Sequence, residues 1–341
     1  MRKLAALMLL LLLAGCGKEV TAREPDLVVR GDAVQARPSP DQLSRGLRIT
    51  STRIAVVTHG QASDPIWAVV KRGIEDARRK ENVGVSYRAP DTFDIQVMKR
   101  MVEAAISDHP DGLIVSLPDA KVLGPAIRMA ERAGIPVVTI NSGGERSAEF
   151  GAIGHVGQDE TIAGQGAGQR LAQDGATKVL CVIHEAGNIG LDQRCSGASK
   201  AFASNGGGGF TTTQVDINDL QGAQSTITSQ LQSNPDIDAV LTLNSSIAAV
   251  AVAAAEDAGS KAKVATFDLN EDVITGIKDG SISFAVDQQQ YEQGYLPIVM
   301  LKLYAENLNT VGGGQPVLTG PGIVDKDNVD AIADLAQKGT R

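Results

Sequence analysis

Residues 54–87 read IAVVTHGQASDPIWAVVKRGIEDARRKENVGVSY: a short apolar run, an amphipathic stretch and a second short run. The two runs, Ile54–Val57 and Val83–Tyr87, are rich in β-branched residues, as strands are. Between them apolar side chains recur every three or four residues from Ile66 to Ala77, which is the spacing of a helix that buries one face. The stretch therefore predicts a parallel βαβ unit.

The same alternation of strand and helix continues along the chain. A second amphipathic stretch runs from Val97 to Ile106. Further strand candidates are Leu113–Val115, Val137–Ile140, Ile153–Val156, Val179–Ile183, Thr211–Val215, Ala239–Leu243, Val264–Phe267 and Ile282–Val286. About ten strands are too many for one sheet in a chain of this size, so the sequence predicts an α/β fold of two doubly wound parallel-sheet lobes.

The N-terminus has the features of an export signal. A charged start is followed by the apolar run Leu4–Ala14, then by Gly15 and Cys16. Leu-Ala-Gly-Cys is typical of the bacterial lipobox, in which the cysteine carries the lipid, so we expect a signal peptide over 1–15 and a lipid anchor at Cys16. The alternative is a plain signal peptide with a chance cysteine. Residues 16–48 contain prolines and no apolar periodicity, which predicts a flexible tether.

The composition limits the possible functions. A net charge of −8 and 3% aromatic residues argue against a nucleic-acid binder, which needs a basic face and stacking rings. In an exported chain Cys181 and Cys195 could form a disulfide, or could remain two buried free thiols. The four histidines lack the short spacing of metal ligands, so we expect no metal, and no cofactor.

Polar residues follow the predicted strands at the edge where doubly wound sheets bind ligands. They are Thr58-His59, Ser116, Asn141-Ser142, His184-Glu185, Asp216, Asn244-Ser245, Asp268 and Asp287-Gln288. Amides, hydroxyls and single carboxylates match a ligand with many hydroxyl groups, each of which donates and accepts. The alternative for any one position is a cap on the following helix.

Three stretches carry a resemblance to a known family. They are Asn244 after its strand, Phe267-Asp268, and the segment DQQQYEQGY at Asp287–Tyr295. With the two-lobe pattern and the export signal, they make residues Arg53 to Lys326 similar to the ribose/galactose-type periplasmic sugar-binding proteins of ABC importers. The resemblance implies a type I binding-protein fold with a multi-strand hinge. It divides the chain into an N-terminal lobe of 49–155 plus 289–315 and a C-terminal lobe of 156–288 plus 316–330.

The resemblance also implies a set of ligand-binding residues. Asp64 looks like the acidic variant found in galactose binders. Trp67 looks like the aromatic ring that stacks on a sugar, and the alternative for Trp67 is a helix residue that faces the core. Ile66 and Ile217 stand where the family often has further rings, which shifts the expectation from a six-membered sugar ring towards a pentose or an acyclic polyol. The full set is His59, Asp64, Trp67, Ser116, Asn141, Ser142, Asn188, Arg194, Asn244, Asp268 and Gln288.

The implied function is capture of a small neutral polyhydroxylated ligand without chemistry. The chain would be a monomer, lipid-anchored to the cell membrane on the periplasmic or outer side, and would deliver its ligand to an ABC permease. A sensor for a membrane kinase or chemoreceptor shares the fold and remains open. An exported sugar-processing enzyme would need a carboxylate pair, and Asp64 with Asp268 is the only candidate.

Overall fold

The computed structural model describes residues 51–60 and 64–341. The expected signal peptide, the lipid anchor at Cys16 and the whole of the expected tether, residues 16–48, lie outside these described residues. Within the described ranges, no helix is both long enough and apolar enough to span a bilayer.

The first sheet has six parallel strands in the order β11-β5-β4-β3-β1-β2. They are β1 (Arg53–Val57), β2 (Gly84–Arg88), β3 (Gly112–Ser116), β4 (Val137–Ile140), β5 (Gly154–Gly157) and β11 (Val317–Leu318). The strands β1 and β2 pair in register from Arg53 opposite Gly84 to Val57 opposite Arg88. The opening stretch therefore forms the predicted parallel βαβ unit.

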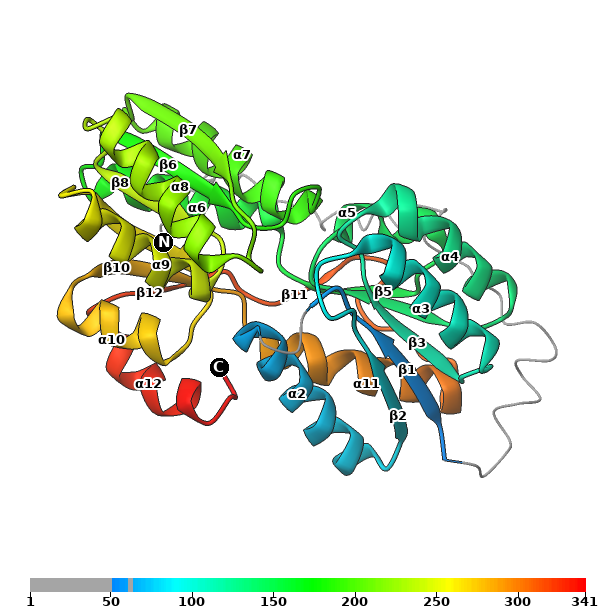
Figure 1. The fold of residues 1–341 in the computed structure, drawn as a ribbon. Coiled ribbons are helices and arrows are strands. Elements are labelled where there is room, and N and C mark those ends of the chain that lie inside the picture. The colour runs from blue at the N-terminus through cyan, green and yellow to red at the C-terminus, as the bar shows by residue number, and fades with distance from the viewer. Residues whose placement is uncertain (1–50, 61–63) are drawn as a thin grey trace, which may run out of the picture. The chain divides into compact units, whose positions relative to one another are not determined.

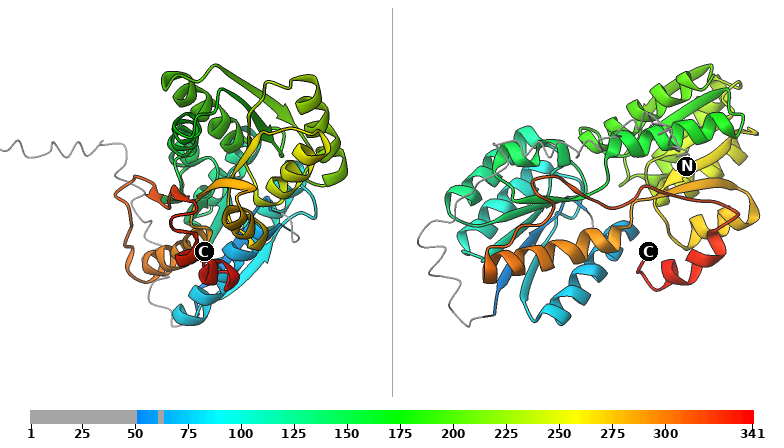
Figure 2. Two further views of the ribbon diagram at one scale, coloured as in Figure 1. Left: turned by 90° about the vertical axis from the view of Figure 1, so that its left-hand side faces the viewer. Right: turned by 180° about the vertical axis from the view of Figure 1, so that it is seen from behind.

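Helices cover both faces of this sheet (Figure 1). Because alternate strand residues point to opposite faces, Val57 and Val115 pack under one pair of helices, and Val56 and Ile114 under the other. The first pair is α3 (Ile95–Ser107) and α4 (Ala120–Arg132); the second is α2 (Pro65–Glu81) and α11 (Gln290–Asn307). Figure 2 shows from behind how α11 runs alongside α2, although far from it in sequence. The short α5 (Gly144–Ser147) and η1 (Ala148–Phe150) follow β4.

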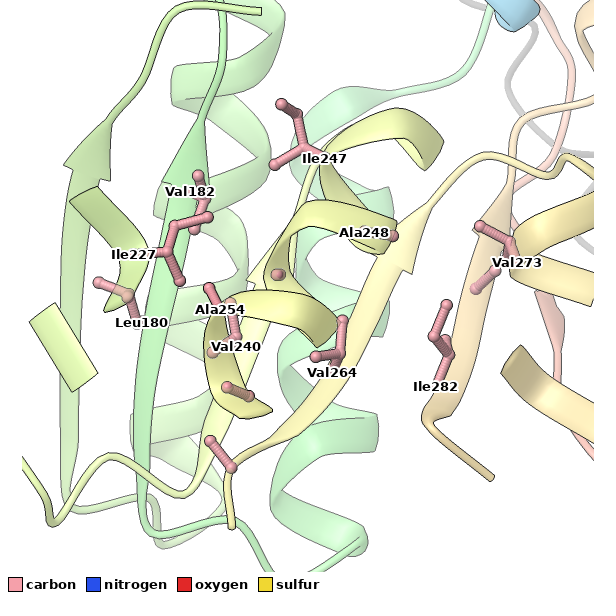
Figure 3. Close-up of a cluster of buried hydrophobic side chains, with 14 of the residues drawn as sticks. Leu180, Val182, Ile227, Val240, Ile247, Ala248, Ala254, Val264, Val273 and Ile282 are labelled. Carbon is pink, nitrogen blue, oxygen red and sulfur yellow. The ribbon is translucent and has the colours of Figure 1, made fainter. Parts of the chain in front are cut away.

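The second sheet repeats this plan in the order β12-β10-β9-β8-β6-β7, with only β12 antiparallel. Its strands are β6 (Lys178–Ile183), β7 (Gly209–Gln214), β8 (Ala239–Thr242), β9 (Lys263–Phe267), β10 (Ile282–Asp287) and β12 (Gly322–Val324). The helices α6 (Glu160–Gln173) and α7 (Ile189–Ser204) cover one face. The other face carries α8 (Leu220–Ser233), α9 (Ser245–Asp257), α10 (Glu271–Asp279) and α12 (Val329–Gln337), whose core appears in Figure 3.

The fold confirms the predicted class and moves two boundaries. The strand β5 pairs with β4 as far as Val156 and with β11 as far as Gly157, both within the first sheet, so the first lobe extends through Gly157 and not to 155. The strand β11, within the segment 316–330 assigned to the second lobe, pairs with β5 in the first. As described from residue 64 onward, the chain passes between the sheets after β5, after β10 and between β11 and β12.

Candidate ligand-binding site

A pocket lies where residues of both lobes meet beyond the carboxyl ends of the strands, as expected for doubly wound sheets. It comprises about 320 Å³ of space between atoms, part of which opens to solvent. Its lining from the first lobe is His59, Asp64, Ile66, Trp67, Asn141 and Ser142. The second lobe and the crossing after β10 contribute His184, Glu185, Asn188, Leu191, Arg194, Leu243, Asp268 and Gln288.

Three helices begin at this pocket, and each is capped by a predicted ligand residue. Asp64 accepts a hydrogen bond from the Ile66 amide at 3.1 Å, and Asn188 accepts one from Gly190 at 3.0 Å. Asn244 likewise caps α9, and its Nδ2 also donates to Asp64 Oδ2 across the lobes at 3.3 Å. The capping alternative is therefore correct for the strand-end residue Asn244, whereas Asp64 and Asn188 cap their helices and also line the pocket.

His59 is held in place by Ser116. The hydroxyl of Ser116 accepts from the His59 amide at 2.9 Å and lies 2.8 Å from the ring Nδ1. Burial, with a contribution from Arg194, lowers the pKa of His59 to about 3, so its ring is neutral. If the hydroxyl proton is directed to Nδ1, the ring proton sits on Nε2, which lies 3.7 Å from Glu185 Oε2 in the other lobe. Ser116 thus supports His59 and does not itself line the pocket.

Arg194 is anchored by a residue that the sequence analysis missed. Its Nε and Nη2 donate to the carboxylate of Glu160 at 2.5 and 3.0 Å, and its Nη1 donates to the Leu243 carbonyl at 3.3 Å. The guanidinium stacks on Phe267 at 4.7 Å. Gln158 donates to Glu160 at 2.7 Å. The Nε, Nη1 and Nη2 atoms of Arg194 therefore each donate a hydrogen bond to an acceptor of the protein itself.

Asp268 is surrounded by amides from the crossing after β10. Gln288 and Gln290 both donate to its Oδ1, at 2.5 and 2.7 Å, whereas its buried Oδ2 has no partner in the described structure. Asn141 reaches Gln288 Oε1 at 3.0 Å, and Gln293 also donates to that oxygen at 3.1 Å. The side chain of Gln290 is buried, so it belongs to this network and not to the solvent-exposed surface.

Asn141 and Asp268 occupy equivalent places in the two lobes. Each follows a strand and has a left-handed backbone, with φ of 62° and 71°. Residues other than glycine rarely adopt this conformation, and they cluster at binding and active sites when they do. The backbone thus aims both side chains at the pocket.

The carboxyl groups of the pocket are hard to ionise. Burial raises the pKa of Asp64 to about 6, that of Asp268 to about 7 and that of Glu185 to about 8. Burial also lowers the pKa of His184 to about 3, with smaller contributions from Arg194 and His59. The buried Nδ1 of His184, like Asp268 Oδ2, has no hydrogen-bond partner among the described residues.

The structure brings most of the predicted residues together. Ser116 and Asn244 stand behind the lining, in contact with His59 and Asp64 respectively. Trp67 both lines the pocket and packs in the core under α2. His184 and Glu185 were recognised as strand-end residues but not assigned to the site, and the strand-end rule alone would have placed them. The predicted residues in the lining are His59, Asp64, Trp67, Asn141, Ser142, Asn188, Arg194, Asp268 and Gln288.

Cys181 and Cys195 form a disulfide, so the free-thiol alternative is wrong. The bond ties the buried strand β6 to α7, one residue after Arg194. It therefore fixes the helix that presents the guanidinium.

Two α/β lobes, a pocket at the carboxyl ends of their strands and side chains from both lobes around it define a protein that holds a small solute between two domains. A family profile described as "Periplasmic binding protein domain" matches residues 54–309. The chain belongs to this family, and it has the type I fold of its members.

Named relatives agree with this assignment. The xylose/arabinose-binding protein XylF of Sulfolobus acidocaldarius is 26% identical over 269 residues, which are 74% of this chain and 66% of that one. The ribose import binding protein RbsB of Bacillus subtilis is 28% identical over 230 residues, 67% and 73% of the two chains. The chain thus spans about two thirds of the length of these relatives.

A solved structure is more similar. A carbohydrate transporter from Acidothermus cellulolyticus 11B, crystallised in complex with myo-inositol, is 41% identical with a TM-score of 0.82. The match covers 86% of this chain and all of that one. The names of these three proteins describe binding and transport, not catalysis.

Proposed function

We propose that this chain is the extracytoplasmic solute-binding component of an ABC importer, and that it captures a neutral carbohydrate (a pentose, a hexose or a sugar alcohol) between its lobes. The observation that carries the proposal is the lining of the pocket. Amide, hydroxyl and carboxyl groups from both lobes converge there, and the only guanidinium among the lining residues is already paired with Glu160. Such groups match hydroxyls, which both donate and accept.

The relatives support a polyhydroxylated ligand. Those named above bind xylose and arabinose, ribose or myo-inositol according to their names. Because the protein with myo-inositol is the most similar of the three, a ligand with a six-membered ring carrying hydroxyls is a candidate, in addition to the pentose or acyclic polyol expected from the sequence. Trp67, one of the lining residues, would contact the apolar face of such a ring.

Binding would proceed by closure of the lobes on the ligand. Contacts that join the lobes already exist: Ser142 Oγ donates to Asn188 Oδ1 at 3.2 Å, and the Ile189 amide donates to the Pro118 carbonyl at 3.0 Å. A ligand that touches both lobes adds its own contacts only when they are together, and so shifts the equilibrium towards the closed form. The three chain crossings would serve as the hinge.

The remaining steps follow from the proposed role. The chain would be exported, held at the membrane by a lipid on Cys16, and would act as a monomer that docks its closed form on a permease. Mass spectrometry of Cys16 in membrane extracts tests the anchor: an unmodified cysteine would contradict it.

The proposal is tested by titration calorimetry with D-ribose, D-xylose, D-glucose, D-galactose, D-allose and myo-inositol. At least one should bind the wild type. Asp268→Ala should weaken that binding at least ~tenfold, because hydrogen bonds to charged groups contribute about 1.5–3 kcal/mol each. Asp272→Ala, an exposed carboxylate of α10, is the matched control. Unchanged affinity in Asp268→Ala would remove that residue from the site.

A further inference from the structure

The pocket holds more negative groups than positive ones. Four carboxyl groups lie in or beside it, on Asp64, Glu160, Glu185 and Asp268, and Arg194 is the one cation among the lining residues. Glu160 occupies that cation with two hydrogen bonds, at 2.5 and 3.0 Å. The charge of Arg194 partly offsets the effect of burial, which raises the pKa of Asp268 and Glu185. One positive charge cannot balance three more carboxylates.

The three remaining carboxyl groups are almost out of reach of water. Asp64, Glu185 and Asp268 are 7%, 5% and 0% exposed. Within the described residues, no lysine and no second arginine forms an ion pair with these three carboxyl groups. The facing rings of His59 and His184 are neutral, because burial lowers the pKa of each to about 3. Burial of a carboxylate without a counter-charge is strongly unfavourable.

Neutral amides are the partners that these carboxyls do have. Asn244 contacts Asp64, Asn188 donates to Glu185 at 2.7 Å, and Gln288 donates to Asp268. All three carboxyl groups line the same pocket and so form one cluster, in which Asp64 also contributes to the raised pKa of the other two. The buried Oδ2 of Asp268 accepts from no described group, which leaves a full acceptor site for a ligand.

We propose that this pocket also takes polyols that carry an amino group, namely amino sugars or aminocyclitols, with their ammonium at the cluster of Asp64, Glu185 and Asp268. An ammonium supplies the missing positive charge and up to three donors to a site made of acceptors. A neutral polyol supplies hydroxyls that donate and accept but no positive charge, and leaves the cluster to hold protons instead. The inference rests on the proposed ligand-binding role of the pocket and extends it to charged ligands.

Matched pairs of ligands test the proposal by calorimetry at pH 7: D-glucosamine with D-glucose, D-galactosamine with D-galactose, and scyllo-inosamine with scyllo-inositol. In at least one pair the amino compound should bind at least ~tenfold more tightly than its neutral partner. The reason is that a hydrogen bond between an ammonium and a buried carboxylate is assisted by both charges and is stronger than one from a neutral hydroxyl. The isosteric variants Glu185→Gln and Asp268→Asn should each reduce that advantage severalfold, and the advantage should vanish at a pH above the pKa of the ligand's amine.

The proposal is overturned if in no pair the amino compound binds better than its neutral partner. It is also overturned if the advantage of the amino compound in both variants is as large as in the wild type. Neutral polyols that still bind in that case leave the proposed function intact. If no neutral or amino compound binds, the proposed function fails as well. Thermal unfolding of each variant, compared with the wild type, establishes that the proteins tested are folded.

Discussion

Arg194 and Glu160 show at the scale of single residues what sequence can and cannot reveal. Arg194 was recognised through the family resemblance, and the structure places it within α7. Glu160 lies 34 residues earlier, in the segment that leaves β5, and only folding brings the two side chains together. The strand-end rule found seven of the fourteen lining residues because it depends on local order, whereas this pair depends on how two helices meet.

A variant of Glu160 tests how far the site depends on this ion pair. Glu160→Gln leaves the buried guanidinium with no full counter-charge, so the free energy of unfolding should fall by about 3–5 kcal/mol. Glu149→Gln breaks a pair in which the Glu149 and Arg146 side chains are 48% and 39% exposed, and should leave stability almost unchanged. Urea unfolding of both variants measures the difference. Equal, small effects would show that Glu160 is dispensable.

At the scale of elements, α6 and α7 approach closely because glycines line their contact. A Cβ on Gly168 would lie 2.1 Å from the Ala198 carbonyl oxygen, and one on Gly164 would lie 2.2 Å from that of Arg194. In the sequence, Gly164–Gly168 reads GQGAG, which lacks the glycine spacing of a dinucleotide-binding motif. The role of the glycines could not be predicted from it, because the partner helix is defined only by the fold.

Two glycine variants on one helix separate packing from helix propensity. Gly168→Ala should destabilise the protein by about 1–3 kcal/mol through overpacking against α7. Gly166→Ala, where a Cβ meets nothing within 4 Å, should stabilise it by up to about 1 kcal/mol. Thermal unfolding compares them. A stabilising Gly168→Ala would contradict the close contact.

The disulfide acts at the same scale, by tying α7 to β6. Replacing both Cys181 and Cys195 by serine should lower the free energy of unfolding by about 3 kcal/mol, the value expected for a bridge that closes a loop of this length. Reduction of the wild type should produce the same loss. Unfolding curves that coincide with and without reductant would rule out the bond.

The lobe boundaries belong to the scale of the whole molecule. Alternating strands and helices predicted two sheets, and ten predicted strands match β1 to β10. The crossings were less well predicted because β11 has only two residues and β5 only four, so their partners decide the lobe. Periodicity in so few residues carries no such information.

Stability should depend on pH through the buried pocket. The raised pKa values of Asp64, Asp268 and Glu185 mean that the folded state keeps protons which the unfolded chain releases, so their contribution is lost as pH rises towards 8. His59, His155 and His184, with lowered pKa values, act below about pH 6.5, where stability falls as pH falls. Above about pH 7 the histidines of the unfolded chain are mostly neutral, so the carboxyls dominate the change in stability.

The melting temperature of the ligand-free protein should therefore fall between pH 6.5 and 8. Glu185 alone costs up to about 1.4 kcal/mol per pH unit there, and each kcal/mol corresponds to roughly 2–4 °C in a protein of this size. Glu185→Gln should flatten the decline, and the exposed Glu256→Gln should not. A melting temperature that rises over this range in the wild type would contradict the buried cluster.

The central claim is that the pocket captures a neutral polyhydroxylated molecule, and the chain contains its own probe. Trp67 is the sole tryptophan of the chain and lines the pocket. Titration of its fluorescence with the pentoses, hexoses and myo-inositol named above should show a saturable change with at least one of them, and the midpoint of that change should lie at a concentration at least ~tenfold higher in Asp268→Ala. Fluorescence that stays constant across the whole panel in the folded wild-type protein would contradict the account.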